Sequence, residues 1–165
     1  MELAVRKKVV VNNSLEITFH RTLRIPDDNR LHQLPASLGK FPLFNVADYA
    51  PHLSPRIVEQ GGIFFPMWQR EAMWVGFVVK GYDVHHRYAL RAFVGGVNAV
   101  SGLPIDKTND EEMKGERKQD YIVLPQQRWI DGICVAPGVV RQFVAMPCGS
   151  TASLARSGDN SRELT

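Results

Sequence analysis

Cysteine is scarce: the 165-residue chain contains only Cys134 and Cys148. Two cysteines in a chain of this length do not make a disulfide framework, and neither belongs to a pattern with zinc-ligand spacing. The neighbouring His85 and His86 point in opposite directions on an extended chain, so they do not indicate a metal site. The sequence therefore predicts neither a bound metal nor another cofactor.

Long apolar runs are absent as well. The first 11 residues include four charged side chains and no signal-type apolar core. The least charged stretch, residues 89–105, is interrupted by Arg91 and is too short to span a bilayer. We expect a protein without a membrane span, and the default location for such a chain is the cytoplasm.

The chain also lacks a strong excess of one charge. It has 20 Lys and Arg against 17 Asp and Glu, a net charge of +3, and its longest basic run is Arg6-Lys7-Lys8. Nucleic-acid binding predicts clustered basic residues interleaved with aromatic ones, and that pattern is missing. We expect a solvated surface with a slight positive excess and no nucleic-acid partner.

What the chain does contain is enough apolar material for a core, since 44% of its residues are hydrophobic. Its length suits one ordinary domain. The stretch from Gly149 onward has few large apolar residues and therefore little to bury. We expect one β-rich domain over residues 1–147 and a polar, mobile tail over residues 148–165.

Residues 15–25 alternate between apolar and polar side chains, which is typical of a half-buried strand. Val9 to Val11 precede this strand across Asn12-Asn13-Ser14, whose residues tolerate the conformations of a hairpin turn. The sequence predicts an N-terminal hairpin, with Thr18 on its exposed face. With later strands packed on one side, the predicted core positions are Leu15, Ile17, Phe19, Leu23, Trp74, Leu90, Phe143 and Val144.

Five prolines between residues 26 and 62 make central strands unfavourable there. Ser54, Pro55 and Gly61 fit the N-cap, first turn and exit of one short helix near 55–60. Strand signals return at residues 71–79, 88–94, 121–124 and 139–146, and the polar window 106–120 fits an exposed loop. The pattern predicts an all-β fold, an antiparallel β-sandwich of jelly-roll type with one short helix.

Two segments are candidates for a binding site. In the first, Trp68, Gln69, Arg70 and Glu71 precede an apolar strand, and an Arg and a Glu beside Trp68 and Trp74 could recognise a sugar or a peptide. The alternative interpretation is an exposed strand entry with both tryptophans in the core.

The second segment contains Arg128, Trp129 and Asp131 before Gly132. An Asp before Gly most often closes a turn by hydrogen-bonding its own backbone. A catalytic acid would need a second carboxylate, for which Glu71 or Asp120 are the candidates. Another nucleophile–base pair, Cys134 with His20, is disfavoured because Cys134 lies in an apolar strand context where a thiol is inert.

Six phrases of the sequence occur in a distinctive order. They are Phe19-His-Arg-Thr-Leu-Arg-Ile-Pro26, Pro66-Met-Trp-Gln-Arg-Glu-Ala-Met-Trp74, Gly95-Gly-Val-Asn-Ala-Val-Ser-Gly102, Gln119-Asp-Tyr-Ile-Val123, Trp129-Ile-Asp-Gly132 and Val140-Arg-Gln-Phe-Val-Ala-Met-Pro147. Together they resemble a family of uncharacterised β-rich proteins of fungi and bacteria, and the resemblance implies a shared fold unit and no particular mechanism.

The favoured function is a non-enzymatic binding or interaction module for a glycan or a protein. One alternative is a hydrolase acting on a glycan, and another is a structural subunit that forms homo-oligomers through an open sheet edge. The strand over 139–146 needs cover along its free backbone, from an earlier strand or from a partner. Since the tail is too polar to provide it, deleting residues 151–165 should leave the melting temperature nearly unchanged.

Overall fold

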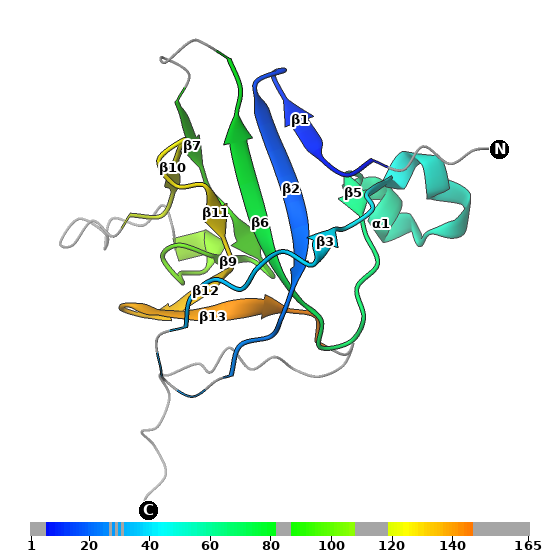
Figure 1. Ribbon diagram of the computed structural model, residues 1–165. Helices are drawn as coiled ribbons and strands as arrows, with labels where there is room; N and C mark the ends of the chain where they lie inside the picture. Colours follow the sequence, from blue (N-terminus) through cyan, green and yellow to red (C-terminus); the bar gives the residue numbers. More distant parts are fainter. Residues whose placement is uncertain are drawn as a thin grey trace, which may run out of the picture.

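The computed structural model describes residues 6–26, 28, 30, 32–81, 87–107 and 119–146. It is mostly β-structure in antiparallel sheets, with one main sheet of seven strands in the order β1-β2-β6-β13-β12, to which β3 and β11 are added beside β2 and β6 (Figure 1). Its strands are β1 (Val9–Val11), β2 (Leu15–Thr22), β3 (Gly39–Lys40), β6 (Ala72–Val79), β11 (Trp129–Ile130), β12 (Gly132–Ala136) and β13 (Val139–Val144).

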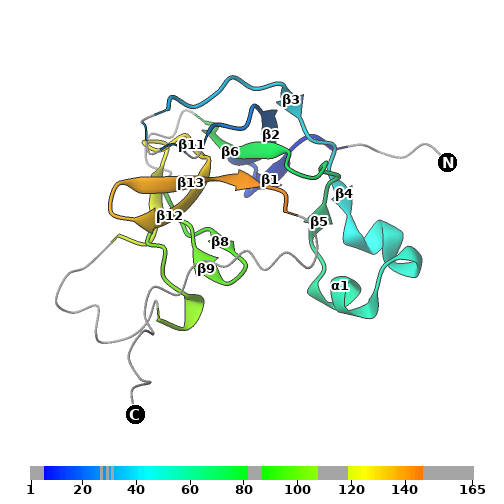
Figure 2. The same ribbon diagram turned by 90° about the horizontal axis from the view of Figure 1, so that it is seen from below.

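Three two-stranded ladders accompany this sheet, and a helical excursion projects from one side of it (Figure 2). The ladders pair β4 (Phe44–Asn45) with β5 (Ile63–Phe64), β7 (Tyr88–Leu90) with β10 (Ile122–Leu124), and β8 (Phe93–Val94) with β9 (Val97–Asn98). The helices are η1 (Val46–His52), α1 (Pro55–Gln60) and η2 (Ile105–Lys107). No helix within the described ranges is long and apolar enough to cross a membrane.

The predicted N-terminal hairpin is confirmed. Strand β1 pairs with β2, and the Ser14 N–H donates a hydrogen bond to the Val11 carbonyl at 3.1 Å. Asn12 and Asn13 have φ values of 50° and 57°, in the left-handed region that asparagine enters more easily than most residues. The turn therefore forms where the asparagines predicted it.

The short helix α1 is also confirmed, with Pro55 in its first turn and Gly61 leaving it at a φ of 63°. The 3₁₀ helix η1 was not predicted. It starts at Asn45, whose side chain accepts a hydrogen bond from the Ala47 N–H at 3.1 Å. A 3₁₀ helix has no 3.6-residue period, so the periodicity of the sequence does not reveal it.

The main core lies on one face of β2 and β6. Leu15 and Phe77 are buried there against Ile122 and Leu124, which come from the β7–β10 ladder packed over this face. Ile17 and Leu90 are partly buried against the same cluster, as predicted. Phe19 contacts Phe65, with ring centroids 5.0 Å apart, next to this core.

The prediction that Thr18 is exposed is wrong. Thr18 and Thr22 are both only 5% exposed. Residues 35–38 cross this second face of the sheet, and the Thr22 hydroxyl donates to the carbonyls of Pro35 and Ala36 at 3.2 and 3.1 Å. The proline-rich excursion therefore covers a face that the alternation alone assigned to solvent.

Leu23 is a second error, because 63% of it is exposed. Strand β2 ends at Thr22, so the alternation no longer governs the direction of the next side chain.

The region expected as one strand over 88–94 is divided into β7 and β8. His85, His86, Cys148, residues 108–118 and the tail 151–165 lie outside the described residues.

The strand over 139–144 pairs with β12 along residues 139–142 and with β6 at its end. Phe143 and Val144 of β13 pair with Met73 and Ala72 of β6, and β12 lies along its other side. An earlier strand of the same chain therefore covers this side of β13 at residues 143 and 144 only. Among the described residues, β1 and β12 end the main order of the sheet, and β3 and β11 each pair with a single strand.

Candidate functional site

Trp68 lies on a tight turn directly before β6. The turn spans Trp68 to Glu71 and is closed by a hydrogen bond from the Glu71 N–H to the Trp68 carbonyl at 3.1 Å. Arg70, its third residue, has a φ of 66°. Trp68 is 79% exposed, and Gln69 and Arg70 are exposed beside it. An indole, an amide and a guanidinium thus face solvent together.

Glu71 holds this turn in place. One carboxylate oxygen accepts a hydrogen bond from the Trp68 N–H at 2.9 Å, and the other forms an ion pair with Nε of Arg21 on β2 at 2.9 Å. The backbone of the turn also pairs with residue 145. The Arg70 N–H donates to the Ala145 carbonyl at 2.7 Å, and the Ala145 N–H donates to the backbone carbonyl of Glu71 at 3.0 Å. The exposed side chains therefore stand on a braced support.

The interpretation that places Trp68 in the core is wrong, because nearly four fifths of it is exposed. A tryptophan before an apolar strand resembles the start of that strand in sequence. The turn reverses the chain before the strand begins, and only the long-range pairing with residue 145 and Arg21 fixes where the indole points.

Trp74 is partly buried on the face of the sheet opposite the main core. Its ring stacks on His20, with centroids 3.8 Å apart and planes 3° apart. His20 also lies within hydrogen-bond distance of Ser37 Oγ and Thr18 Oγ1, both at 2.8 Å. Burial, and to a smaller extent the positive charge of Lys40, lower the pKa of His20.

Gly76 makes room for this stack. A Cβ at residue 76 would lie 2.9 Å from Thr18 Oγ1 and 2.9 Å from Cζ3 of Trp74. Trp129 pairs with Gly76 across the strands and is 42% exposed, so its side chain lies on the same face of the sheet as Trp74. Trp74 was predicted in the core, and it is instead part of this second, smaller aromatic layer.

The segment from Arg128 to Asp131 is held mainly through its backbone. The Arg128 carbonyl accepts a hydrogen bond from the Phe77 N–H at 2.8 Å, and the Asp131 carbonyl accepts one from the Phe143 N–H at 2.7 Å. Asp131 lies directly between β11 and β12 rather than in a tight turn. Gly132 permits the close strand contact here, since a Cβ would lie 2.0 Å from the Arg141 carbonyl oxygen.

The two candidate segments do not form one site. Glu71 precedes β6, whereas Trp129 pairs with Gly76, five residues along the chain and roughly 16 Å at strand spacing. Glu71 contacts Arg21, which pairs with Met73, and Met73 and Gly76 are an odd number of residues apart. Since side chains alternate across a sheet, Glu71 and Trp129 lie on opposite faces.

A Cys134–His20 pair is not formed either. His20 is on β2 and Cys134 on β12, with β6 and β13 between them, so about 14 Å of sheet separates the two strands. The Cys134 Sγ instead lies 3.3 Å from the Ala136 carbonyl. Within the described part of the chain, no group of three His, Cys, Asp or Glu residues is arranged to hold a metal ion.

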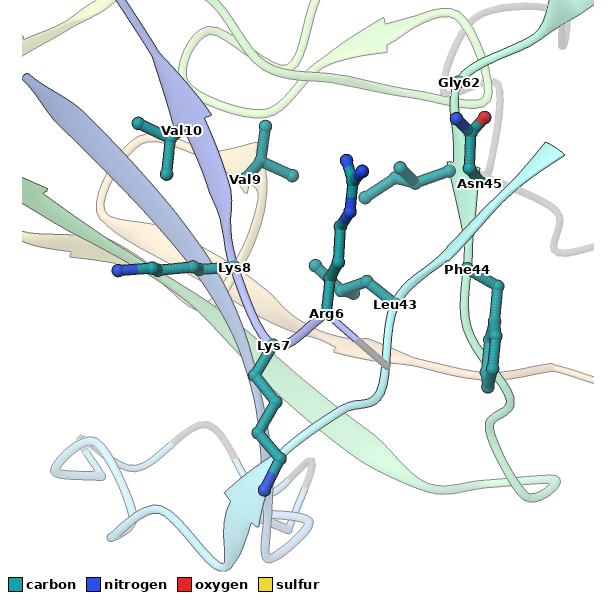
Figure 3. Close-up of a pocket in the computed structure, with 10 residues that line it drawn as sticks. Arg6, Lys7, Lys8, Val9, Val10, Leu43, Phe44, Asn45 and Gly62 are labelled. Atoms are coloured by element: carbon teal, nitrogen blue, oxygen red, sulfur yellow. The ribbon is translucent and has the colours of Figure 1, made fainter. Parts of the chain in front are cut away.

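The sequence reading missed a groove of about 640 Å³ between β1 and the β4–β5 ladder (Figure 3). Its basic residues, Arg6 to Lys8, were interpreted only as part of a solvated surface. The one local signal was their place directly before a short valine strand. Comparisons with protein-family models, with curated proteins and with solved structures give no match.

Proposed function

We propose that the protein is a non-enzymatic interaction module that binds a polypeptide partner through the turn from Trp68 to Arg70. The observation that carries this proposal is the 79% exposure of Trp68 on a turn braced by Glu71. We further interpret the packing of the β7–β10 ladder over the main sheet as a sandwich of jelly-roll type, which serves as the rigid support.

The chemistry of the turn favours a macromolecular partner. Tryptophan and arginine are enriched among the residues that dominate the binding energy of protein interfaces. Small ligands prefer concave sites that bury most of their surface, whereas Trp68 stands on a turn and projects into solvent. A projecting indole suits a pocket on a partner protein better than it suits a small sugar.

The alternative of a glycan hydrolase has less support. In its first candidate residue, Glu71, one carboxylate oxygen accepts a hydrogen bond from the Trp68 N–H and the other forms an ion pair with Arg21. A general acid or nucleophile must reach the scissile bond, and a carboxylate held in this way is a brace rather than an open reactive group. The argument for a structural subunit is weakened at the end of β13, since Phe143 and Val144 pair with β6 of the same chain.

Site-specific photo-crosslinking in cells of the source organism tests the proposal. A photoreactive amino acid at residue 69 should give discrete adducts with a protein partner, and Trp68→Ala should abolish them. The matched control is Trp129→Ala, which removes a 42% exposed indole on the opposite face and should leave the adducts unchanged.

Two results would contradict the proposal. One is a set of adducts that persists in Trp68→Ala, which would place the partner elsewhere. The other is quenching of Trp68 fluorescence by cellohexaose or chitohexaose, absent in Trp68→Ala and without any protein adduct. That second result would establish the glycan alternative instead.

A further inference from the structure

Strand β1 is an edge of the main sheet. It pairs only with β2 within the part of the chain that the structure describes, through Val9–Ile17, Val10–Glu16 and Val11–Leu15. Just before it, the Arg6 carbonyl accepts a hydrogen bond from the Leu43 N–H at 2.7 Å. Beyond this hydrogen bond, β1 and residues 43–45 separate, and a gap opens between them.

The backbone along this gap is suited to accept another strand. In an extended chain, the N–H and C=O of every second residue face the same edge. Because the Arg6 carbonyl faces Leu43, the backbone groups of Lys8 and Val10 face the gap as well. Those of Val9 and Val11 face β2 and serve the hairpin.

The gap is a groove with two walls. Residues 6–10 form one wall, and Leu43, Phe44, Asn45, Gly62 and Ile63 form the other. Figure 3 shows Arg6 extending into the space between Val9 and Asn45. A volume of about 640 Å³ is within the range of roughly 300–1,000 Å³ that is usual for ligand sites. Val10 is 46% exposed and Ile63 is 40% exposed, so both walls offer apolar surface.

The charge of the groove selects its occupant. Three cations, Arg6, Lys7 and Lys8, line it, and none of its lining residues within the described part of the chain is acidic. Lys8 is paired with Glu16 of β2, and this ion pair, with a further one from Lys80, lowers the pKa of the Glu16 carboxyl. Among the described residues, Arg6 and Lys7 have no ion-pair partner.

We propose that this groove binds an extended acidic peptide segment of another protein, which adds as a strand to the free edge of β1. Main-chain hydrogen bonds to Lys8 and Val10 supply affinity, and carboxylates near Arg6 and Lys7 supply selectivity. A second copy of this chain is a poor occupant, since edge-to-edge pairing would bring two basic segments together, and lysines on an edge discourage such pairing. The groove is separate from the Trp68 turn, so this inference does not depend on the proposed function.

The direct test uses the whole ¹⁵N-labelled protein and a capped heptapeptide of alternating Glu and Val. Binding by strand addition should slow hydrogen exchange at the Lys8 and Val10 amides, whereas Val9 and Val11 are already protected by β2. A matched peptide that is N-methylated on every residue has no N–H left for the ladder on either edge, and it should bind at least about tenfold more weakly. A Lys-Val peptide of the same pattern should not bind.

Two pairs of variants separate the contribution of backbone hydrogen bonds to peptide binding from the contribution of charge. Val10→Pro removes one outward N–H at a position where an edge strand tolerates proline, and it should abolish binding, whereas Val10→Ala should retain it. Lys7→Glu should weaken binding by roughly tenfold at low salt, whereas Lys40→Glu on β3 should have little effect. If Val10→Pro fails to fold, the N-methylated peptide and Lys7→Glu still decide the question.

Three results would overturn the inference. The Glu-Val peptide and its N-methylated counterpart could bind equally well, or the Lys8 and Val10 amides could exchange as fast with the Glu-Val peptide as without it. The third is that Lys7→Glu binds the Glu-Val peptide as tightly as the wild type does. Trp68→Ala should bind the Glu-Val peptide normally. Loss of binding in Trp68→Ala would assign the peptide to the turn and contradict the assignment to β1.

Discussion

Glu71 shows how much one side chain contributes to the candidate site. Its carboxylate joins the turn at Trp68 to Arg21 on β2, and the side chain is only 16% exposed. Trp68 belongs to the same sequence pattern as Glu71, whereas Arg21 is 50 residues away in the chain. The sequence pattern singles this residue out for ligand binding, whereas the contacts it forms are those of a brace.

Replacing Glu71 should therefore cost stability as well as order in the turn. Glu71→Ala leaves the Trp68 N–H without its hydrogen-bond acceptor and the Arg21 guanidinium without its ion-pair partner. We expect a loss of about 1–3 kcal/mol in the free energy of unfolding. Urea denaturation measures this loss. Glu59→Ala, an exposed residue on α1, is the control and should change stability by less than about 0.5 kcal/mol. Equal effects would mean that the Glu71 contacts are not formed in solution.

His20 gives a prediction for pH dependence. Its folded-state pKa is lowered, first by burial and then by Lys40, so the unfolded chain takes up a proton more readily, near the ordinary value of 6.5. Stability should thus be complete above about pH 6.5 and fall as the pH decreases below it. Melting temperatures at pH 7.5 and 5.5 should show a smaller loss for His20→Gln than for the wild type. His52→Gln, which replaces an exposed histidine, should behave like the wild type.

At the scale of elements, the N-terminal hairpin depends on local conformation. Asn12 and Asn13 both have positive φ values, and the three-residue loop leaves no other way to reverse the chain. Strand β2, in contrast, depends on what packs against it. Its alternation predicts the strand and the direction of Leu15, but both of its faces are covered, one by the main core and the other by residues 35–38.

The turn can be tested by changing Asn13. A β-branched residue is strained in the left-handed region, so Asn13→Val should destabilise the protein by about 1–2 kcal/mol. Asn13→Gly accepts a φ of 57° without strain and should be neutral or slightly stabilising. Both free energies come from urea denaturation. A neutral Asn13→Val would show that the loop has a different conformation in solution.

At the scale of the whole molecule, stability should be concentrated in the pairing of β2 with β6. These strands pair over eight positions and are flanked by β1 and β3 on one side and by β11 and β13 on the other. The β4–β5 and β8–β9 ladders have two pairs each. The candidate turn therefore lies at the end of the most extensively paired strands, and the groove lies at the edge of the same sheet.

Native-state hydrogen exchange measures this difference. Amides that bond β2 to β6 should exchange slowest, on the order of 100-fold slower than those of β4–β5 and β8–β9, because short ladders open without unfolding the sheet. The β4–β5 ladder is also a wall of the groove, so its opening would be slowed by a bound peptide. Uniform exchange across all ladders would contradict this arrangement.

The sequence by itself determined the features that depend on neighbouring residues. The asparagine turn, the helix that begins at Pro55 and the strand from Ala72 follow from local conformational preference and from alternation. These preferences act within a few residues, and no distant contact is needed to realise them. The all-β character and the antiparallel pairing follow from the number and spacing of such strands.

Only the tertiary structure decided which side chains are covered and which surfaces are free. Alternation separates Thr18 from Phe19, but it cannot show that Thr18 is buried beside Gly76 and His20. Nor can it show that residues 35–38 cover Thr22. Likewise, the exposure of Trp68 depends on Arg21 and residue 145, and the groove beside β1 depends on where Leu43 leaves the edge. These outcomes depend on pairs of residues far apart in the chain, whose contacts leave no local pattern.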